Sequence, residues 1–205
     1  MMKAAPRKIA CALALLGFLA PGGLAAAPDT GEEDLASLVD AVRALDLGEG
    51  GYRIGAALTD DQLPGDPSDY QDDAYPGTIK FVDGDLGVVA DEETRLVLAI
   101  FQRHEDVGAA KVRQQMAHLM TTFGEPTASA HGKLVYWAYG PEGPIDNATY
   151  QAAKEDGALD VLATVKINST LSLDDISNDP DLEETGTVYY IITSERLLKY
   201  HVTQP

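Results

Sequence analysis

Residues 78–102, TIKFVDGDLGVVADEETRLVLAIFQ, decide the fold of this chain. They contain three runs rich in strand-forming residues, at 78–82, 86–90 and 95–102. The first two runs are separated only by Asp83-Gly84-Asp85, a tight-turn tripeptide. Connections this short join neighbouring strands in antiparallel fashion, because a parallel pair needs a long crossover. The stretch therefore predicts a three-stranded antiparallel meander.

The longest helical pattern follows this meander, at about residues 107–123. Its apolar residues recur at three- and four-residue spacing, which predicts one buried stripe. The stripe consists of Val112, Met116, Leu119, Met120 and Phe123. Gly124 ends the pattern and Pro126 prevents its continuation. We expect this segment to be the main helix.

Three further strand-like runs lie at 133–139, 158–168 and 187–193. Ser194 could cap a short final helix that runs through His201, although residues 197–202 could equally form a strand. Strands thus come in consecutive runs with few helices between them, which indicates an α+β protein rather than a doubly wound parallel sheet. We expect an antiparallel sheet of about five or six strands with one main helix packed on one face.

The first 27 residues have the three parts of a secretory signal peptide. A basic head comes first, Ile9 to Ala20 is an apolar run, and Leu24 to Ala27 supplies small residues for cleavage. The apolar run is too short to span a bilayer, which takes roughly 20 residues. We therefore expect a periplasmic or secreted protein with three parts: a signal peptide (1–27), an N-terminal helix and linker (28–51) and a single α+β domain (52–205).

The net charge and the position of the only cysteine limit the kinds of partner and chemistry expected for this protein. After removal of the signal peptide the chain has 12 Lys and Arg against 33 Asp and Glu, a net charge of −21. Such a chain is repelled by phosphate backbones, so we expect no nucleic-acid partner. Cys11, the only cysteine, lies inside the signal peptide. The remaining chain therefore has no disulfide and no cysteine nucleophile, and we expect no membrane anchor after signal cleavage.

Motifs of common enzymes are absent from the sequence. It has no Gly-rich phosphate loop, no Gly-x-Ser-x-Gly elbow and no His-Glu-x-x-His helix. The four histidines do not lie at metal-ligand spacing: His104, His118, His131 and His201. The acidic segments 66–73 and 174–181 lack the order of a calcium loop, so they are predicted to be solvated loops. We expect no catalytic residue, no metal ligand and no cofactor.

An aromatic cluster is the best candidate for a binding site. Tyr136, Trp137 and Tyr139 lie on one predicted strand, and Tyr189 and Tyr190 lie on another. Because adjacent strand residues point to opposite faces, we expect Tyr136 to face the main helix and Trp137 to face away from it. Tyr and Trp are enriched at interfaces, so Trp137, Tyr139, Tyr189 and Tyr190 are the predicted binding residues. Ordinary core and sheet packing is the alternative.

One segment resembles a known group of envelope proteins. Phe123-Gly124-Glu125-Pro126-Thr127, followed by Leu134-Val135-Tyr136-Trp137-Ala138-Tyr139, is a helix end, Gly-x-Pro, and a strand with Trp-x-Tyr. This pattern resembles the outer-membrane assembly lipoproteins and the β-lactamase inhibitor proteins. The resemblance implies a helix laid on an antiparallel sheet and a protein-binding role. The anchoring cysteine of the lipoproteins is missing here.

Three functions follow in order of preference. The first is an exported, non-catalytic binding or protein-interaction module that uses the aromatic strand face on an envelope protein. The second is a small-ligand-binding protein with a pocket between helix and sheet. The third is a hydrolase. A flat, exposed aromatic patch would favour the first function, whereas a deep concave pocket lined by polar groups would favour the second or third.

Overall fold

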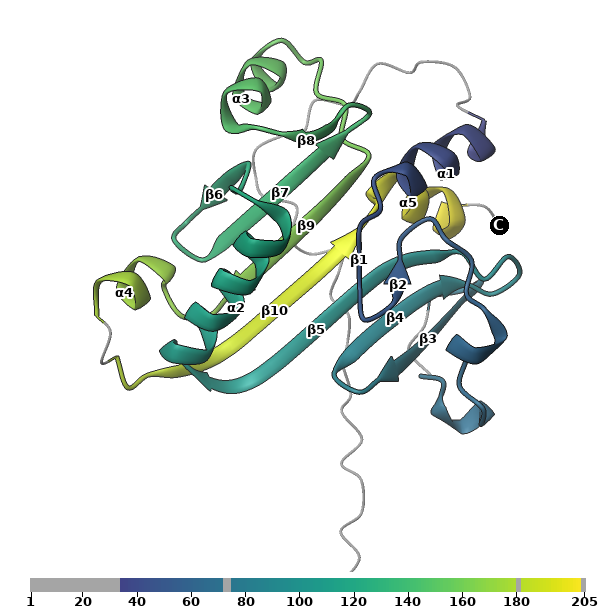
Figure 1. Cartoon of the computed structure of the whole chain (residues 1–205), viewed down its shortest axis with the longest axis horizontal. Coiled ribbons are helices and arrows are strands. Elements are labelled where there is room, and N and C mark those ends of the chain that lie inside the picture. Colours follow the sequence, from purple (N-terminus) through teal and green to yellow (C-terminus); the bar gives the residue numbers. More distant parts are fainter. Residues whose placement is uncertain (1–33, 72–74, 180–181, 204–205) are drawn as a thin grey trace, which may run out of the picture.

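The predicted meander is present and forms one side of a large antiparallel sheet (Figure 1). It consists of β3 (Thr78–Asp83), β4 (Leu86–Asp91) and β5 (Val97–Gly108). The register of β3 and β4 is continuous around the predicted turn, where Gly84 has a φ of 60°. That backbone conformation suits glycine, which explains why this tripeptide can reverse the chain so tightly. The computed structural model describes residues 34–71, 75–179 and 182–203.

Eight strands make up the sheet, in the order β3-β4-β5-β10-β9-β7-β6, with β8 paired to β7. The strands that continue the sheet beyond the meander are β6 (Ala128–Ala130), β7 (Leu134–Gly140), β8 (Gly143–Ile145), β9 (Ala163–Ser169) and β10 (Thr185–Thr193). The last strand in the chain therefore lies in the middle of the sheet, between β5 and β9. All the pairings are antiparallel.

The expected number of five or six strands was too low. The additional strands are β6 and β8, each of three residues, and both pair along the same edge of β7. Three residues are too few to show an alternating pattern. In addition, β8 contains Pro144, which in sequence indicates a turn and in a sheet is tolerated at an edge.

The structure also has more helices than the one main helix expected against the sheet and the N-terminal helix expected within 28–51. The described helices are α1 (Leu35–Ala44), α2 (Ala109–Phe123), α3 (Asn147–Glu155), α4 (Leu173–Asn178) and α5 (Glu195–Thr203). The longest is α2, which confirms the predicted main helix and its end at Gly124. In contrast, α4 lies in a segment predicted to be an acidic loop. Only Ile176 of α4 is buried, so the sequence offers no apolar period to detect.

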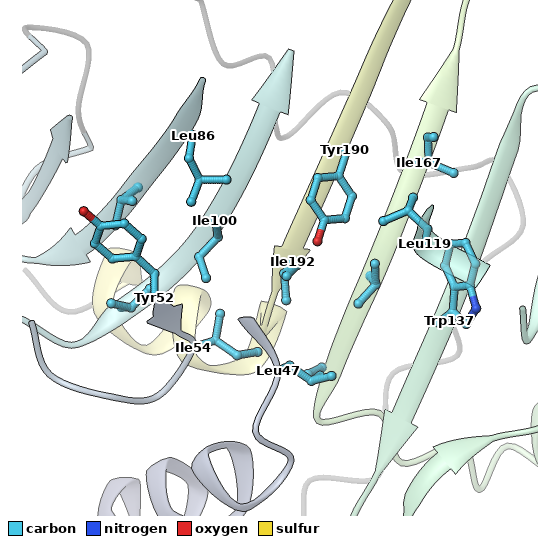
Figure 2. Packing of buried hydrophobic residues seen from close by; sticks show 14 of the residues in the cluster. Leu47, Tyr52, Ile54, Leu86, Ile100, Leu119, Trp137, Ile167, Tyr190 and Ile192 are labelled. Atoms are coloured by element: carbon cyan, nitrogen blue, oxygen red, sulfur yellow. The ribbon is translucent and has the colours of Figure 1, made fainter. Parts of the chain in front are cut away.

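One face of the sheet, here called the inner face, carries the main core. Val88, Ile100, Val165, Trp137 and Tyr190 belong to it, and each is at most 2% exposed. Figure 1 shows α2 over the half with β7, β9 and β10, and the small hairpin of β1 (Gly48–Glu49) and β2 (Tyr52–Arg53) over the other half. In Figure 2, Leu119 of α2 lies beside Trp137, while side chains near the hairpin point toward β4 and β5. The helix α1 contributes to the same cluster.

The opposite face, here called the outer face, carries a smaller cluster of buried residues. Its members are Val89, Ala99, Phe101 and Ile191. The Phe101 ring lies directly over Gly87, where a Cβ atom would be 2.2 Å from the ring. The strand position of Gly87 therefore serves close packing of an aromatic ring. Among the described residues, none of the helices is both long and apolar enough to cross a membrane. The predicted signal peptide, residues 1–27, lies outside the described residues.

Candidate functional site

The alternation on β7 is the reverse of the prediction. Trp137 faces α2 and is 2% exposed. Its indole nitrogen Nε1 donates a hydrogen bond of 2.9 Å to the carbonyl oxygen of Gly124, and its ring lies 6.3 Å from that of Phe123. The expectation that Tyr136 would pack under the helix was wrong. The side chains on both faces of β7 are apolar or aromatic, so their alternation does not show which face is turned toward α2. The larger indole, with a partner for its N–H at the end of α2, takes the inner face.

Tyr136 instead packs on the other side of β7. Its ring makes an edge contact with Tyr150 of α3, with ring centroids 5.5 Å apart. Burial raises the pKa of the Tyr136 hydroxyl, and the neighbouring Tyr150 raises it further. Tyr136 is partly buried, so it is a packing residue between the sheet and α3.

The predicted binding residues Trp137, Tyr139, Tyr189 and Tyr190 lie on two faces of the sheet. Trp137, Tyr139 and Tyr190 belong to the inner-face core and are 2%, 7% and 1% exposed. Burial raises the pKa of Tyr190, with smaller contributions from Glu49 and Tyr139. Tyr189 lies on the outer face, stacked on Phe101 with ring centroids 6.2 Å apart. Three of the four residues are thus core residues, and they share no solvent-facing surface with Tyr189.

A concave site lies elsewhere, between α2, the β6–β7 hairpin and α4. We call it the α2–α4 groove; its volume is about 460 Å³. Its apolar lining includes Met116, Met120, Leu134, Leu173 and Ile176. Its polar lining includes Arg113, Ser129, Asp174 and Ser177. Sequence reasoning missed the groove because one of its walls, α4, had been predicted as a loop.

Hydrogen bonds hold the walls of the α2–α4 groove together. The Arg113 guanidinium on α2 donates to the carbonyl oxygen of Ile176 on α4 at 3.0 Å. The backbone N–H of Leu173 donates to the carbonyl oxygen of Gly132 in the β6–β7 hairpin at 2.6 Å. The Ser172 hydroxyl caps α4 by accepting from the Asp175 N–H at 3.1 Å. The groove is therefore preformed by contacts between distant segments.

Glycine is required at one point of the groove. Gly132 has a φ of 59°, which a side chain would strain. A Cβ atom there would also lie 2.8 Å from a carboxylate oxygen of Asp174. Glycine at 132 therefore serves chiefly the left-handed backbone of the β6–β7 turn, because the Asp174 carboxylate is the end of a flexible side chain and could move aside.

Two of the four histidines lie beside carboxylates, in different parts of the molecule. His201 on α5 contacts Asp91 at the end of β4, with Nδ1 and Oδ2 2.9 Å apart. Asp91 also accepts hydrogen bonds from the backbone and hydroxyl of Thr94, each at 2.6 Å. His118 of α2 lies 3.7 Å from the Glu49 carboxylate. In the described ranges, no three His, Cys, Asp or Glu side chains are grouped so that they could hold a metal ion.

Comparisons with protein-family models, with curated proteins and with solved structures found no match to this chain. The assignment of a function therefore depends on the geometry of the sites themselves.

Proposed function

We propose that the protein is an exported, non-catalytic binding protein that holds a small, largely apolar ligand in the α2–α4 groove. The observation that carries this proposal is the groove itself. Its volume of about 460 Å³ falls in the range of roughly 300–1,000 Å³ that is usual for ligand sites. Its lining is mostly apolar with a few polar groups, which is the usual composition of such sites.

The placement of the aromatic residues favours a small ligand over a protein partner. An interaction surface built on the predicted aromatic strand face would need Trp137, Tyr139 and Tyr190 to be accessible, yet they lie in the core. The α2–α4 groove instead presents Met116 and Met120. Methionine has a flexible, polarisable side chain that adapts to ligands of different shape. These features support the second function expected from the sequence.

A neutral hydrophobic dye, Nile red, tests the proposal. We expect saturable Nile red fluorescence with the purified protein, and an affinity about tenfold or more weaker in Met120→Glu, because a carboxylate would be placed in an apolar wall. Val82→Glu is the matched control: Val82 on β3 is 49% exposed and Met120 is 46% exposed, but Val82 does not line the groove. Equal losses in both variants, or no saturable binding in the parent protein, would contradict the proposal.

Export is part of the same proposal. The protein used in the dye experiment is recovered from an envelope or culture fraction of the expressing cells, and its intact mass is measured. We expect the mass of a chain that begins at Pro28, because Leu24 to Ala27 supply the small residues at the cleavage point. Recovery of the chain only from the cytoplasm, with Cys11 retained, would contradict export without affecting the dye result.

A further inference from the structure

Sulfur is confined to one place in the described part of this protein. The four methionines of the chain are Met1, Met2, Met116 and Met120, and the single cysteine is Cys11. Outside the first 33 residues, therefore, the chain has only two sulfur atoms, both in thioethers. Both belong to residues that line the α2–α4 groove. Because they are four residues apart on α2, they lie on the same side of that helix.

The two methionines differ in accessibility. Met120 is 46% exposed and is one of three large hydrophobic side chains exposed among the described residues. Met116 is partly buried and packs against the inner-face core. A peroxide molecule in solution can therefore reach the thioether of Met120 more readily than that of Met116. Exposure is a main determinant of which sulfur is oxidised.

We infer that Met120 is a reversible oxidation site that switches off ligand binding in the α2–α4 groove; this inference rests on the proposed function. The thioether sulfur attacks one oxygen of hydrogen peroxide, an S–O bond forms and the O–O bond breaks. The sulfur is oxidised by two electrons to a sulfoxide. The other oxygen departs as hydroxide, takes up the proton from the oxygen now bound to sulfur and leaves as water.

The chemistry of the product explains the switch. Oxidation converts a flexible apolar side chain into a polar one. At position 120 the new oxygen enters a groove whose lining is mostly apolar. Contact between an unmatched polar group and an apolar ligand weakens binding. Methionine sulfoxide reductases supplied with a dithiol reverse the change: the dithiol gives two electrons and two protons and becomes a disulfide, the sulfoxide oxygen leaves as water and the thioether is restored. In an envelope protein without cysteine, these thioethers are the sulfur groups exposed to oxidants.

The test combines peptide mapping with the Nile red assay. The purified protein is treated with hydrogen peroxide, and the gain of one oxygen atom is located by mass spectrometry. We expect Met120 to be oxidised before Met116, and the Nile red affinity to fall by about tenfold as Met120 sulfoxide accumulates. Treatment with methionine sulfoxide reductases should restore both the mass and the affinity.

Two variants distinguish the effect of oxidising Met120 from general oxidative damage to the protein. Met120→Leu removes the oxidisable sulfur but keeps an apolar side chain of similar volume, so its Nile red affinity after peroxide treatment should equal its own affinity before treatment. Met116→Leu should lose affinity on peroxide treatment as the parent protein does. An equal rate of oxidation at both positions, or oxidation of Met120 with unchanged affinity, would overturn the switch while leaving the groove as a ligand site. Absence of Nile red binding before treatment would overturn the proposed function and the switch together.

Discussion

At the residue scale, Trp137 connects the core of the sheet with the end of α2. It combines burial at 2% exposure with a hydrogen bond to the carbonyl oxygen of Gly124, where α2 ends. The indole therefore fills the space under the helix and also provides a partner for a helix-terminal carbonyl, which has none within the helix. A change at this residue affects both the core and the end of α2.

Substitution of Trp137 should show these two roles. We expect Trp137→Ala to lower the free energy of unfolding by about 3–5 kcal/mol, the usual cost of removing a large buried ring. Trp137→Phe should cost less, because it keeps an aromatic ring and loses the hydrogen bond. The measurement is urea unfolding followed by far-UV circular dichroism. Tyr136→Ala is the control on the other side of β7; a loss there as large as that of Trp137→Ala would contradict the assignment of faces.

The orientation of β7 could not be read from its residues. Leu134, Tyr136 and Ala138 form one set, and Val135, Trp137 and Tyr139 form the other. Periodicity separates the two sets but does not say which one faces the core when both are apolar. The deciding contacts come from Phe123 and Gly124, which only the three-dimensional structure places against Trp137. The α2–α4 groove was missed for another reason, because its wall α4 lies in a segment predicted to be a loop.

At the element scale, α5 shows how a tertiary contact settles an ambiguous segment. Its sequence fits a helix or a strand, but the structure has a helix whose Leu197 is fully buried and whose His201 contacts Asp91. Asp91 lies at the end of β4, 110 residues away. The contact connects α5 to the turn between β4 and β5. A local sequence pattern cannot reveal a contact between residues so far apart in the chain.

Ionised Asp91 should stabilise the fold at neutral pH, and this stabilisation should be lost at acid pH. Burial alone would raise the pKa of Asp91, but hydrogen bonds from Thr94 and the neighbouring His201 outweigh it, so the net pKa is lowered. A carboxyl group with a lowered pKa in the folded state stabilises the fold above the unfolded-state pKa of about 3.9, and this contribution is lost as pH falls through the folded value.

The expected result is a pH profile that differs between two variants. Asp91→Asn should be less stable than the parent protein at neutral pH, and the difference should shrink below about pH 4 as Asp91 becomes protonated. Thermal unfolding from pH 7 down to acid conditions measures it. The control is Asp85→Asn, at an exposed position in the β3–β4 turn. Its stability should stay close to that of the parent protein at every pH. A constant deficit for Asp91→Asn across this range would show that its ionisation does not contribute.

At the scale of the whole molecule, local patterns predicted the fold class but not the arrangement of the sheet. The meander, α2 and the other long strands have strong periodicity, so they could be identified from sequence. The central position of β10 could not, because it depends on pairing with β5 and β9 rather than on chain neighbours. Short elements such as β6, β8 and α4 bury too few residues to leave a pattern.

The inner-face core includes residues of α1 as well as Trp137 under α2. Leu38 of α1 is 5% exposed and belongs to the same buried cluster as Leu119 of α2. A cluster that is continuous between both ends should unfold as one unit, because loss of packing at one end exposes apolar surface throughout. This continuity can be tested with one distant substitution and two probes.

Leu38→Ala should lower the free energy of unfolding by about 2–5 kcal/mol, as other buried Leu→Ala changes do. Trp137 is the only tryptophan of the chain, so its fluorescence reports on the end of the core under α2. Far-UV circular dichroism reports on the whole molecule. If the core is one unit, the urea midpoints from both probes should coincide in the parent protein and fall together in Leu38→Ala. A fluorescence midpoint that stays in place while the circular dichroism midpoint falls would instead mean that α1 and α2 cover two independently unfolding parts of the sheet.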